Sequence, residues 1–128
     1  MSRELVTRWV SKISEAEKDL PLLLVSGYAY TPRMAYTEVL NGTALGNQLQ
    51  ALIETGRFGT STLDEQAIAK VRLQQILQSK PDKPLFATLS GKVFTPSELL
   101  QEIESGTQIG QQWLNQEISH MKMIVNVR

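Results

Sequence analysis

Hydrophobic residues recur along this chain at the three- and four-residue spacing of amphipathic helices, broken by short apolar runs beside turn residues. The first such stretch, residues 2–19, predicts a helix that ends before Pro21. Its apolar face is expected to consist of Leu5, Val6, Trp9, Val10 and Ile13.

A second long helix is predicted over residues 63–79, after a capping-box sequence from Thr62 to Glu65. Its buried stripe is expected to consist of Ala69, Leu73, Ile76 and Leu77. The opposite face is rich in glutamine and charge and is expected in solvent: Gln66, Lys70, Arg72, Gln74, Gln75 and Gln78.

One stretch of the sequence occurs twice. Residues 26–48 align without a gap with residues 90–112, and Ser, Gly, Thr, Pro, Glu, Gly, Thr, Gly and Gln recur in register. These residues are common at caps and turns, so coincidence is the alternative explanation. The fixed spacing over the whole alignment favours a duplicated structural unit, and two copies favour a closed pair over an open array.

Each copy predicts a helix, a tight turn and a second helix. Threonine caps the first helix and proline occupies its first position, while glycine ends it in a left-handed conformation. Another threonine then caps the second helix, and a glycine in its first turn predicts close backbone packing. The defining residues are Thr31, Pro32, Gly42, Thr43 and Gly46 in the first copy, and Thr95, Pro96, Glu98, Gly106, Thr107 and Gly110 in the second.

Two short strands around a Ser-Gly turn are predicted before each Thr-Pro pair, although a continuous extended segment is also possible in the first copy. The expected fold class is therefore α+β and predominantly helical, with two pseudo-symmetric repeats of helix–β-hairpin–helix–turn–helix. We expect one domain over residues 1–128, with halves of about 1–59 and 60–128. The tail, residues 121–128, could form an edge strand, prolong the last helix or hang free.

The composition narrows the function. The formal net charge is zero, whereas proteins that bind nucleic-acid backbones usually carry a basic excess. Because the chain has no cysteine, disulfides and thiolate metal sites are excluded. The longest apolar run, residues 22–25, is too short to cross a bilayer, and a cytoplasmic protein without a membrane partner is expected.

Candidates for catalysis are few. The single histidine, His120, lies near a predicted helix end, where a surface role or an interaction with the helix dipole is the expected one. Glu38 and Glu102 occupy matching positions, and could either converge across a twofold axis or each bond a local donor. We therefore predict a chain that is not an enzyme, with no catalytic residue, no metal site and no cofactor.

The expected function is a noncatalytic protein–protein interaction or assembly module, binding a protein partner or itself. Divergence between the copies places an aromatic surface in the first half, with Tyr28, Arg33 and Tyr36 as contact residues. Trp113 and the apolar tail are the second choice, although Trp113 could instead belong to the core. The strand-like tail could also mediate self-association.

A nucleic-acid-associated regulator is the alternative function. In that case residues 97–104 would form the first helix of a helix–turn–helix and residues 107–119 the helix that reads bases. Four of its side chains can bond adenine edges, namely Gln108, Gln111, Gln112 and Asn115. That helix carries no Lys or Arg, so the usual source of phosphate contacts is missing. An enzyme using Glu38 and Glu102 ranks third.

Overall fold

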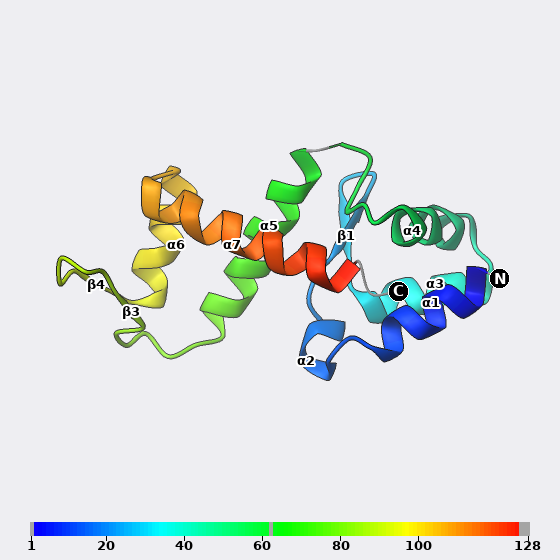
Figure 1. The fold of residues 1–128 in the computed structure, drawn as a ribbon, viewed down its shortest axis with the longest axis horizontal. Coiled ribbons are helices and arrows are strands. Elements are labelled where there is room, and N and C mark those ends of the chain that lie inside the picture. Colours follow the sequence, from blue (N-terminus) through cyan, green and yellow to red (C-terminus); the bar gives the residue numbers. More distant parts are fainter. Residues whose placement is uncertain (1, 62, 126–128) are drawn as a thin grey trace.

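The computed structural model describes residues 2–61 and 63–125, in which helices predominate and strands form two short hairpins. The elements are α1 (Ser2–Ser11), α2 (Glu15–Lys18), β1 (Leu23–Val25), β2 (Tyr28–Tyr30), α3 (Pro32–Asn41), α4 (Ala44–Thr55), α5 (Leu63–Gln78), β3 (Phe86–Ala87), β4 (Val93–Phe94), α6 (Pro96–Ser105) and α7 (Gln108–Val125). The molecule is elongated, with α1, α3 and α4 near one end and the hairpin of β3 and β4 at the other (Figure 1). The predicted α+β, predominantly helical class is confirmed.

The first helix is shorter than predicted. The pattern predicted one helix over residues 2–19, but α1 ends at Ser11 and α2 begins at Glu15. Between them Ser14 is extended, and its hydroxyl accepts a hydrogen bond from the Glu17 N–H at 3.4 Å. A serine that caps a new helix offers the backbone an alternative to continuing the old one, so the single helix was wrong. The predicted apolar face is buried at Val6, Trp9, Val10 and Ile13.

Both Thr-Pro pairs begin helices. Thr31 accepts a hydrogen bond from the Met34 N–H at 3.1 Å, which satisfies one of the unpaired donors at the start of α3. Thr95 does the same for the Glu98 N–H at 3.3 Å. The Glu98 carboxylate in turn accepts from the Thr95 N–H at 3.0 Å, completing a capping box that α3 lacks.

A left-handed glycine ends each of these helices. Gly42 has φ of 67° and Gly106 has φ of 68°, a region that residues with a Cβ rarely adopt. In both turns the glycine N–H bonds carbonyl groups of the preceding helical turn. The chain can therefore reverse within two residues, and α3 packs along α4 as α6 packs along α7.

The threonine after each glycine links the two helices of its pair. In the first pair the Thr43 hydroxyl accepts from the Gly46 N–H at 2.9 Å and donates to the Glu38 carboxylate at 2.8 Å. One side chain thus caps α4 and holds a carboxylate of α3 in place.

The second pair has the same contacts. The Thr107 hydroxyl accepts from the Gly110 N–H at 3.2 Å and donates to the Glu102 carboxylate at 2.9 Å. Each matched carboxylate therefore bonds a local donor. The helices that carry Glu38 and Glu102, α3 and α6, lie towards opposite ends of the molecule (Figure 1).

The glycines in the first turns of α4 and α7 are sites of close backbone packing, which confirms that prediction. A Cβ at Gly46 would lie 2.6 Å from the carbonyl carbon of Glu38, and a Cβ at Gly110 would lie 2.6 Å from that of Glu102. Real Cβ atoms do not approach so closely, so only glycine allows the helices of each pair to meet in this way.

The two predicted hairpins are present, so the continuous extended segment considered for the first copy was wrong. In the first hairpin Leu23 lies opposite Tyr30, and β1 also packs against α4 and α5. In the second hairpin Phe86 lies opposite Phe94, and β4 packs against α6. The first hairpin lies between helices, whereas the second projects beyond α6 (Figure 1).

One residue of α5 lies on the opposite side from that predicted. Of the predicted stripe, Ala69, Leu73 and Leu77 are buried, as is Ile68, whereas Ile76 is half-buried. Arg72, which the pattern placed in solvent, is 0% exposed. That assignment was wrong, because long charged side chains can be buried when carboxylates pair with them, and those carboxylates lie far away in the sequence. The predicted cap Thr62 lies outside the described residues.

The last helix continues into the tail. α7 runs to Val125, so residues 121–125 are helical and the edge-strand interpretation of this part was wrong. Met121 and Val125 are buried, which gives the helix an apolar stripe that continues beyond the repeated motif. Residues 126–128 lie outside the described part of the chain. Self-association through a strand formed by residues 121–125 loses its basis, because these residues are helical.

The leading helix of each half packs against the helix pair that follows it. α1 contacts α3 and α4, and α5 contacts α6 and α7. These contacts join elements that occupy the same order in the two halves. α7 then reaches from its own half back towards the first half, where its end lies near β1 and α1 in the view (Figure 1).

Candidate functional site

A buried ion cluster lies where α2, α5 and α7 meet. The Arg72 guanidinium bonds the Glu117 carboxylate at 2.7 Å, the Pro21 carbonyl at 2.9 Å and the Glu17 carboxylate. The second carboxylate oxygen of Glu17 lies 2.9 Å from His120 Nε2. Residues from both halves of the chain therefore share one charged cluster, and the sequence pattern identified none of its bonds.

The pKa of Glu17 reflects two opposing influences. Burial would raise it, but hydrogen bonds from Arg72 and His120 outweigh burial and hold the pKa below 4.5, the usual value. A carboxylate whose pKa is lower in the folded than in the unfolded state stabilises the fold above the unfolded pKa. That stabilisation is lost as the pH falls through the folded pKa.

We therefore expect acid to destabilise the native chain more than a Glu17→Gln variant. The variant lowers the free energy of unfolding near neutral pH, because the Arg72 guanidinium loses a charged partner. Between about pH 5 and about pH 2 its stability should fall less steeply than that of the native chain. Urea unfolding at a series of pH values measures both slopes, and equal slopes would contradict this role for Glu17.

The aromatic surface predicted in the first half is only partly exposed. Tyr28, on β2, is 69% exposed. Tyr36, on α3, is half-buried against the core. The Arg33 side chain is paired within the chain, since it bonds Asp19 at 2.9 Å and Glu15 at 3.0 Å, and these hydrogen bonds raise its pKa above the usual value.

Arg33 shares a shallow hollow with residues other than the two predicted tyrosines. The hollow has a volume of about 270 Å³ and is lined by Tyr30, Arg33, Met34, Thr37 and Glu38. Neither Tyr28 nor Tyr36 belongs to this lining. Of the predicted contact residues, Tyr28 has the largest apolar surface available to a partner.

Trp113 belongs to an aromatic cluster at the base of the second hairpin. Its ring meets Phe86 edge-on, with ring centroids 5.5 Å apart, and Phe86 lies 6.1 Å from Phe94. Trp113 is half-buried there, so it supports the hairpin from α7 and lies in a different unit from Tyr28. The structure thus does not bring the four predicted contact residues together.

The second hairpin carries apolar side chains that point into solvent. Leu89 is fully exposed at the tip, Leu85 is 42% exposed and Val93 is 47% exposed. We call these three residues the arm surface. The ungapped repeat aligns Leu89 with buried Val25, but in the structure Thr88 bonds Lys92 where Val25 pairs with Tyr28, so Leu89 is an additional residue of a longer turn. The sequence pattern did not indicate the arm surface, because it shows neither the length of this turn nor what covers the hairpin.

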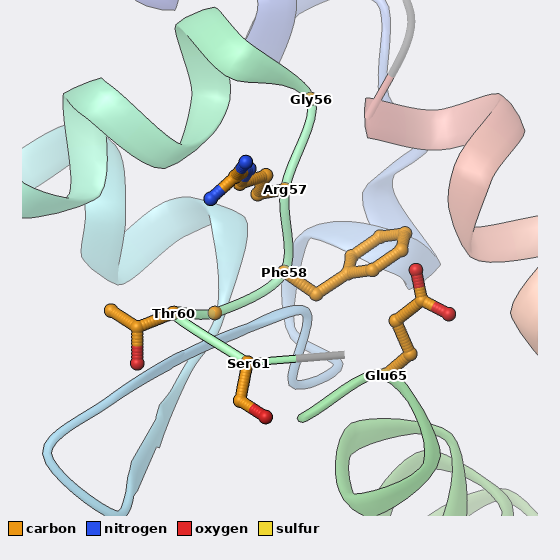
Figure 2. Close-up of a pocket in the computed structure, with 7 residues that line it drawn as sticks. Gly56, Arg57, Phe58, Thr60, Ser61 and Glu65 are labelled. Carbon is orange, nitrogen blue, oxygen red and sulfur yellow. The ribbon is translucent and has the colours of Figure 1, made fainter. Parts of the chain in front are cut away.

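A further hollow of about 210 Å³ lies over the loop between α4 and α5, lined by Gly56, Arg57, Phe58, Gly59, Thr60, Ser61 and Glu65. The side chains of Arg57 and Phe58 point to opposite sides of the loop (Figure 2). Phe58 is 2% exposed, so it anchors the loop in the core, whereas Arg57 is exposed.

Neither a metal-binding cluster nor a membrane-spanning helix is found in the described part of the chain. Residues 2–61 and 63–125 contain no group of three or more His, Asp or Glu side chains placed to hold a metal ion. Within the same residues, no helix combines the length and the apolar character needed to cross a bilayer.

Comparison with protein-family models, with curated proteins and with solved structures found no match for this chain. The assignment of a function therefore depends on the geometry of the chain itself. Three features can support such an assignment, namely the buried ion cluster, the exposed Tyr28 side chain and the arm surface.

Proposed function

We propose that this chain is a noncatalytic protein–protein interaction module, built from a duplicated helix–hairpin–helix–turn–helix unit. The observation that carries the proposal is the arm surface, where Leu85, Leu89 and Val93 are exposed on a projecting hairpin. Apolar side chains grouped on one projecting element are typical of surfaces that a partner covers.

The duplication in this proposal is supported by matching details in the two helix pairs. Left-handed glycines, threonine caps bonded to a carboxylate, and glycines at the helix contact occur at aligned positions. A unit used twice provides two hairpins on one scaffold. In this proposal the buried ion cluster holds the scaffold together, and the hairpins supply contact residues such as Tyr28 and Leu89.

Site-specific photocrosslinking tests this function. A photoreactive phenylalanine analogue placed at Leu89 or Tyr28 should give discrete adducts with another protein in cells that contain this chain. The same analogue at Gln48, which is exposed on α4 outside both hairpins, is the control. We expect no matching adduct from the control, because a partner on the hairpins does not cover α4. Identical adducts from all positions, or none from either hairpin, would reject the proposal.

A nucleic-acid-associated regulator remains the second candidate function, favoured by one observation. Gln108, Gln111, Gln112 and Asn115 are all exposed in the first part of α7, where a reading helix would present them. Basic residues are scarce there, because the first Lys or Arg of α7 is Lys122. Phosphate contacts supply most nonspecific affinity for DNA, so this candidate is the weaker one.

We expect no binding to a mixed-sequence DNA duplex, even at low salt. Fluorescence anisotropy of a labelled duplex measures this directly. The matched variant is Gln111→Ala with Gln112→Ala, which removes two exposed amides that can bond adenine. Binding that weakens with salt and disappears in the variant would support the second candidate instead.

A further inference from the structure

The first hairpin already carries a docked loop from elsewhere in the chain. After α4 ends at Gly56, the loop returns to β1, where the Leu24 N–H donates to the Phe58 carbonyl at 2.7 Å. The Phe58 side chain is buried at the same point, with 2% exposed. One backbone hydrogen bond and one aromatic anchor therefore cover the outer edge of β1.

The second hairpin has no such cover in the described residues. His120 aligns with Gly56, and α7 continues through this position to Val125 instead of ending. No described residue outside the second hairpin bonds the backbone of β3. The chain that would have returned to this hairpin is used in α7, where its apolar residues pack into the core.

The uncovered edge of β3 offers a backbone donor. The Thr88 N–H bonds the Lys92 carbonyl at 2.8 Å across the hairpin. Because successive N–H groups along a strand point to opposite sides, the Ala87 N–H points away from β4. Ala87 and Leu24 face matching partners, Val93 and Ala29, so Ala87 takes the place that Leu24 has in the first hairpin.

We propose that the edge of β3 binds an extended acidic segment of a partner protein that carries an aromatic residue. This inference rests on the proposed function and specifies how the module binds its partner, which is by the addition of a strand to an exposed sheet edge. The partner backbone accepts from Ala87, as the Phe58 carbonyl accepts from Leu24. Its aromatic side chain packs against the exposed apolar side chains of the arm surface, Leu85, Leu89 and Val93.

The charges around the second hairpin select the acidic character of the segment. Lys80, Lys83 and Lys92 are exposed along this part of the chain. Between residues 80 and 94 the acid is Asp82, which is engaged by Ser97 through a hydroxyl at 2.8 Å and a backbone N–H at 3.3 Å. Residues 80–94 thus carry three lysines and one aspartate, and this excess of positive charge complements a negative partner.

Peptide display on the full-length chain tests this binding. Random peptides of about a dozen residues, long enough to form one added strand, are selected against the immobilised protein. We expect the enriched peptides to share an aromatic residue flanked by Asp or Glu. Enrichment of basic peptides, or no enrichment, would overturn the inference.

Two substitutions at one position locate the bound peptide. Ala87→Pro removes the backbone donor, whereas Ala87→Val keeps it and suits an exposed strand. We expect Ala87→Pro to weaken binding by about tenfold or more and Ala87→Val to change it little, because only proline lacks the N–H. Circular dichroism and the urea midpoint verify that both variants fold. Equal binding by Ala87→Pro and the native chain would show that the peptide lies elsewhere.

The outcomes separate this inference from the proposed function. Crosslinks from Tyr28 without peptide binding at Ala87 would retain the interaction module and reject the β3 edge. Light scattering tests the other occupant of an exposed edge, a second copy of the chain. A dimer that Ala87→Pro dissociates would reject a heterologous partner, whereas a monomer at all concentrations agrees with the inference.

Discussion

Replacing Arg72 with methionine should lower the free energy of unfolding by about 3–5 kcal/mol, the range found when a buried ion pair loses one partner. The Arg72 side chain is 0% exposed, and its removal leaves the carboxylates of Glu17 and Glu117 without their cation. The Pro21 carbonyl also loses its donor. Because the four residues belong to α2, α5, α7 and the segment before β1, the loss should affect the contact between the halves.

Urea unfolding followed by tryptophan fluorescence measures this loss. The matched control is Arg33→Met, which removes the same group from an exposed cluster with Glu15 and Asp19 and should change the midpoint little. A triple variant with Arg72→Met, Glu17→Gln and Glu117→Gln should recover part of the loss, because no buried charge is then left unpaired. A midpoint for Arg72→Met equal to that of the control would contradict the cluster's role.

The second large effect is expected from adding a methyl group at the helix contacts. Gly46→Ala and Gly110→Ala should each destabilise the chain by about 2–3 kcal/mol, towards the upper end for overpacking. In each case the new Cβ would overlap a backbone carbonyl of the preceding helix, and backbone cannot rotate aside as a side chain can. The gain in helix propensity from glycine to alanine, about 1 kcal/mol, is too small to compensate.

Two nearby substitutions provide the control for this effect. Gln48→Ala and Gln112→Ala lie two residues after the glycines and are exposed, so neither should shift the urea midpoint appreciably. Similar losses at Gly46 and Gly110 are expected, because the same carbonyl contact occurs in both helix pairs. A neutral or stabilising effect at either glycine would contradict this prediction, because it would show that the two helices of that pair can move apart with little loss of stability.

The helix pairs could be predicted from the sequence because their determinants are local. Thr31, Gly42 and Thr43 act on residues within one turn of themselves, and the second copy repeats that spacing. The two glycines of close packing were predicted for the same reason, since only a backbone contact explains glycine within both first turns.

The ion cluster could not be predicted, because its partners are distant in the sequence. Arg72 lies 55 residues from Glu17 and 45 from Glu117, so helical periodicity placed it among solvent-facing residues. The break before α2 was missed for a related reason. Ser14 can cap a helix or sit within one, and the helix was expected to continue to the stop signal at Pro21.

The arm surface was missed because the two copies differ in what covers them. Periodicity and turn residues predict both hairpins, but they do not show that Phe58 returns to β1 while α7 continues past the equivalent position. Leu89 is exposed because it lies in the turn of the second hairpin, which is one residue longer than the turn of the first. Tyr28 could be identified from sequence as a divergent aromatic, whereas the pairing of Arg33 with Asp19 required the fold.

Amide hydrogen exchange at Leu24 and Ala87 tests most directly whether the second hairpin keeps an open edge for a partner. In the chain alone, the Leu24 amide should exchange slowly because it is bonded to Phe58, and the Ala87 amide should exchange fast. Adding the selected acidic aromatic peptide should slow Ala87 and leave Leu24 unchanged. An Ala87 amide already protected in the monomeric chain, or one that stays fast at saturating peptide, would contradict the account.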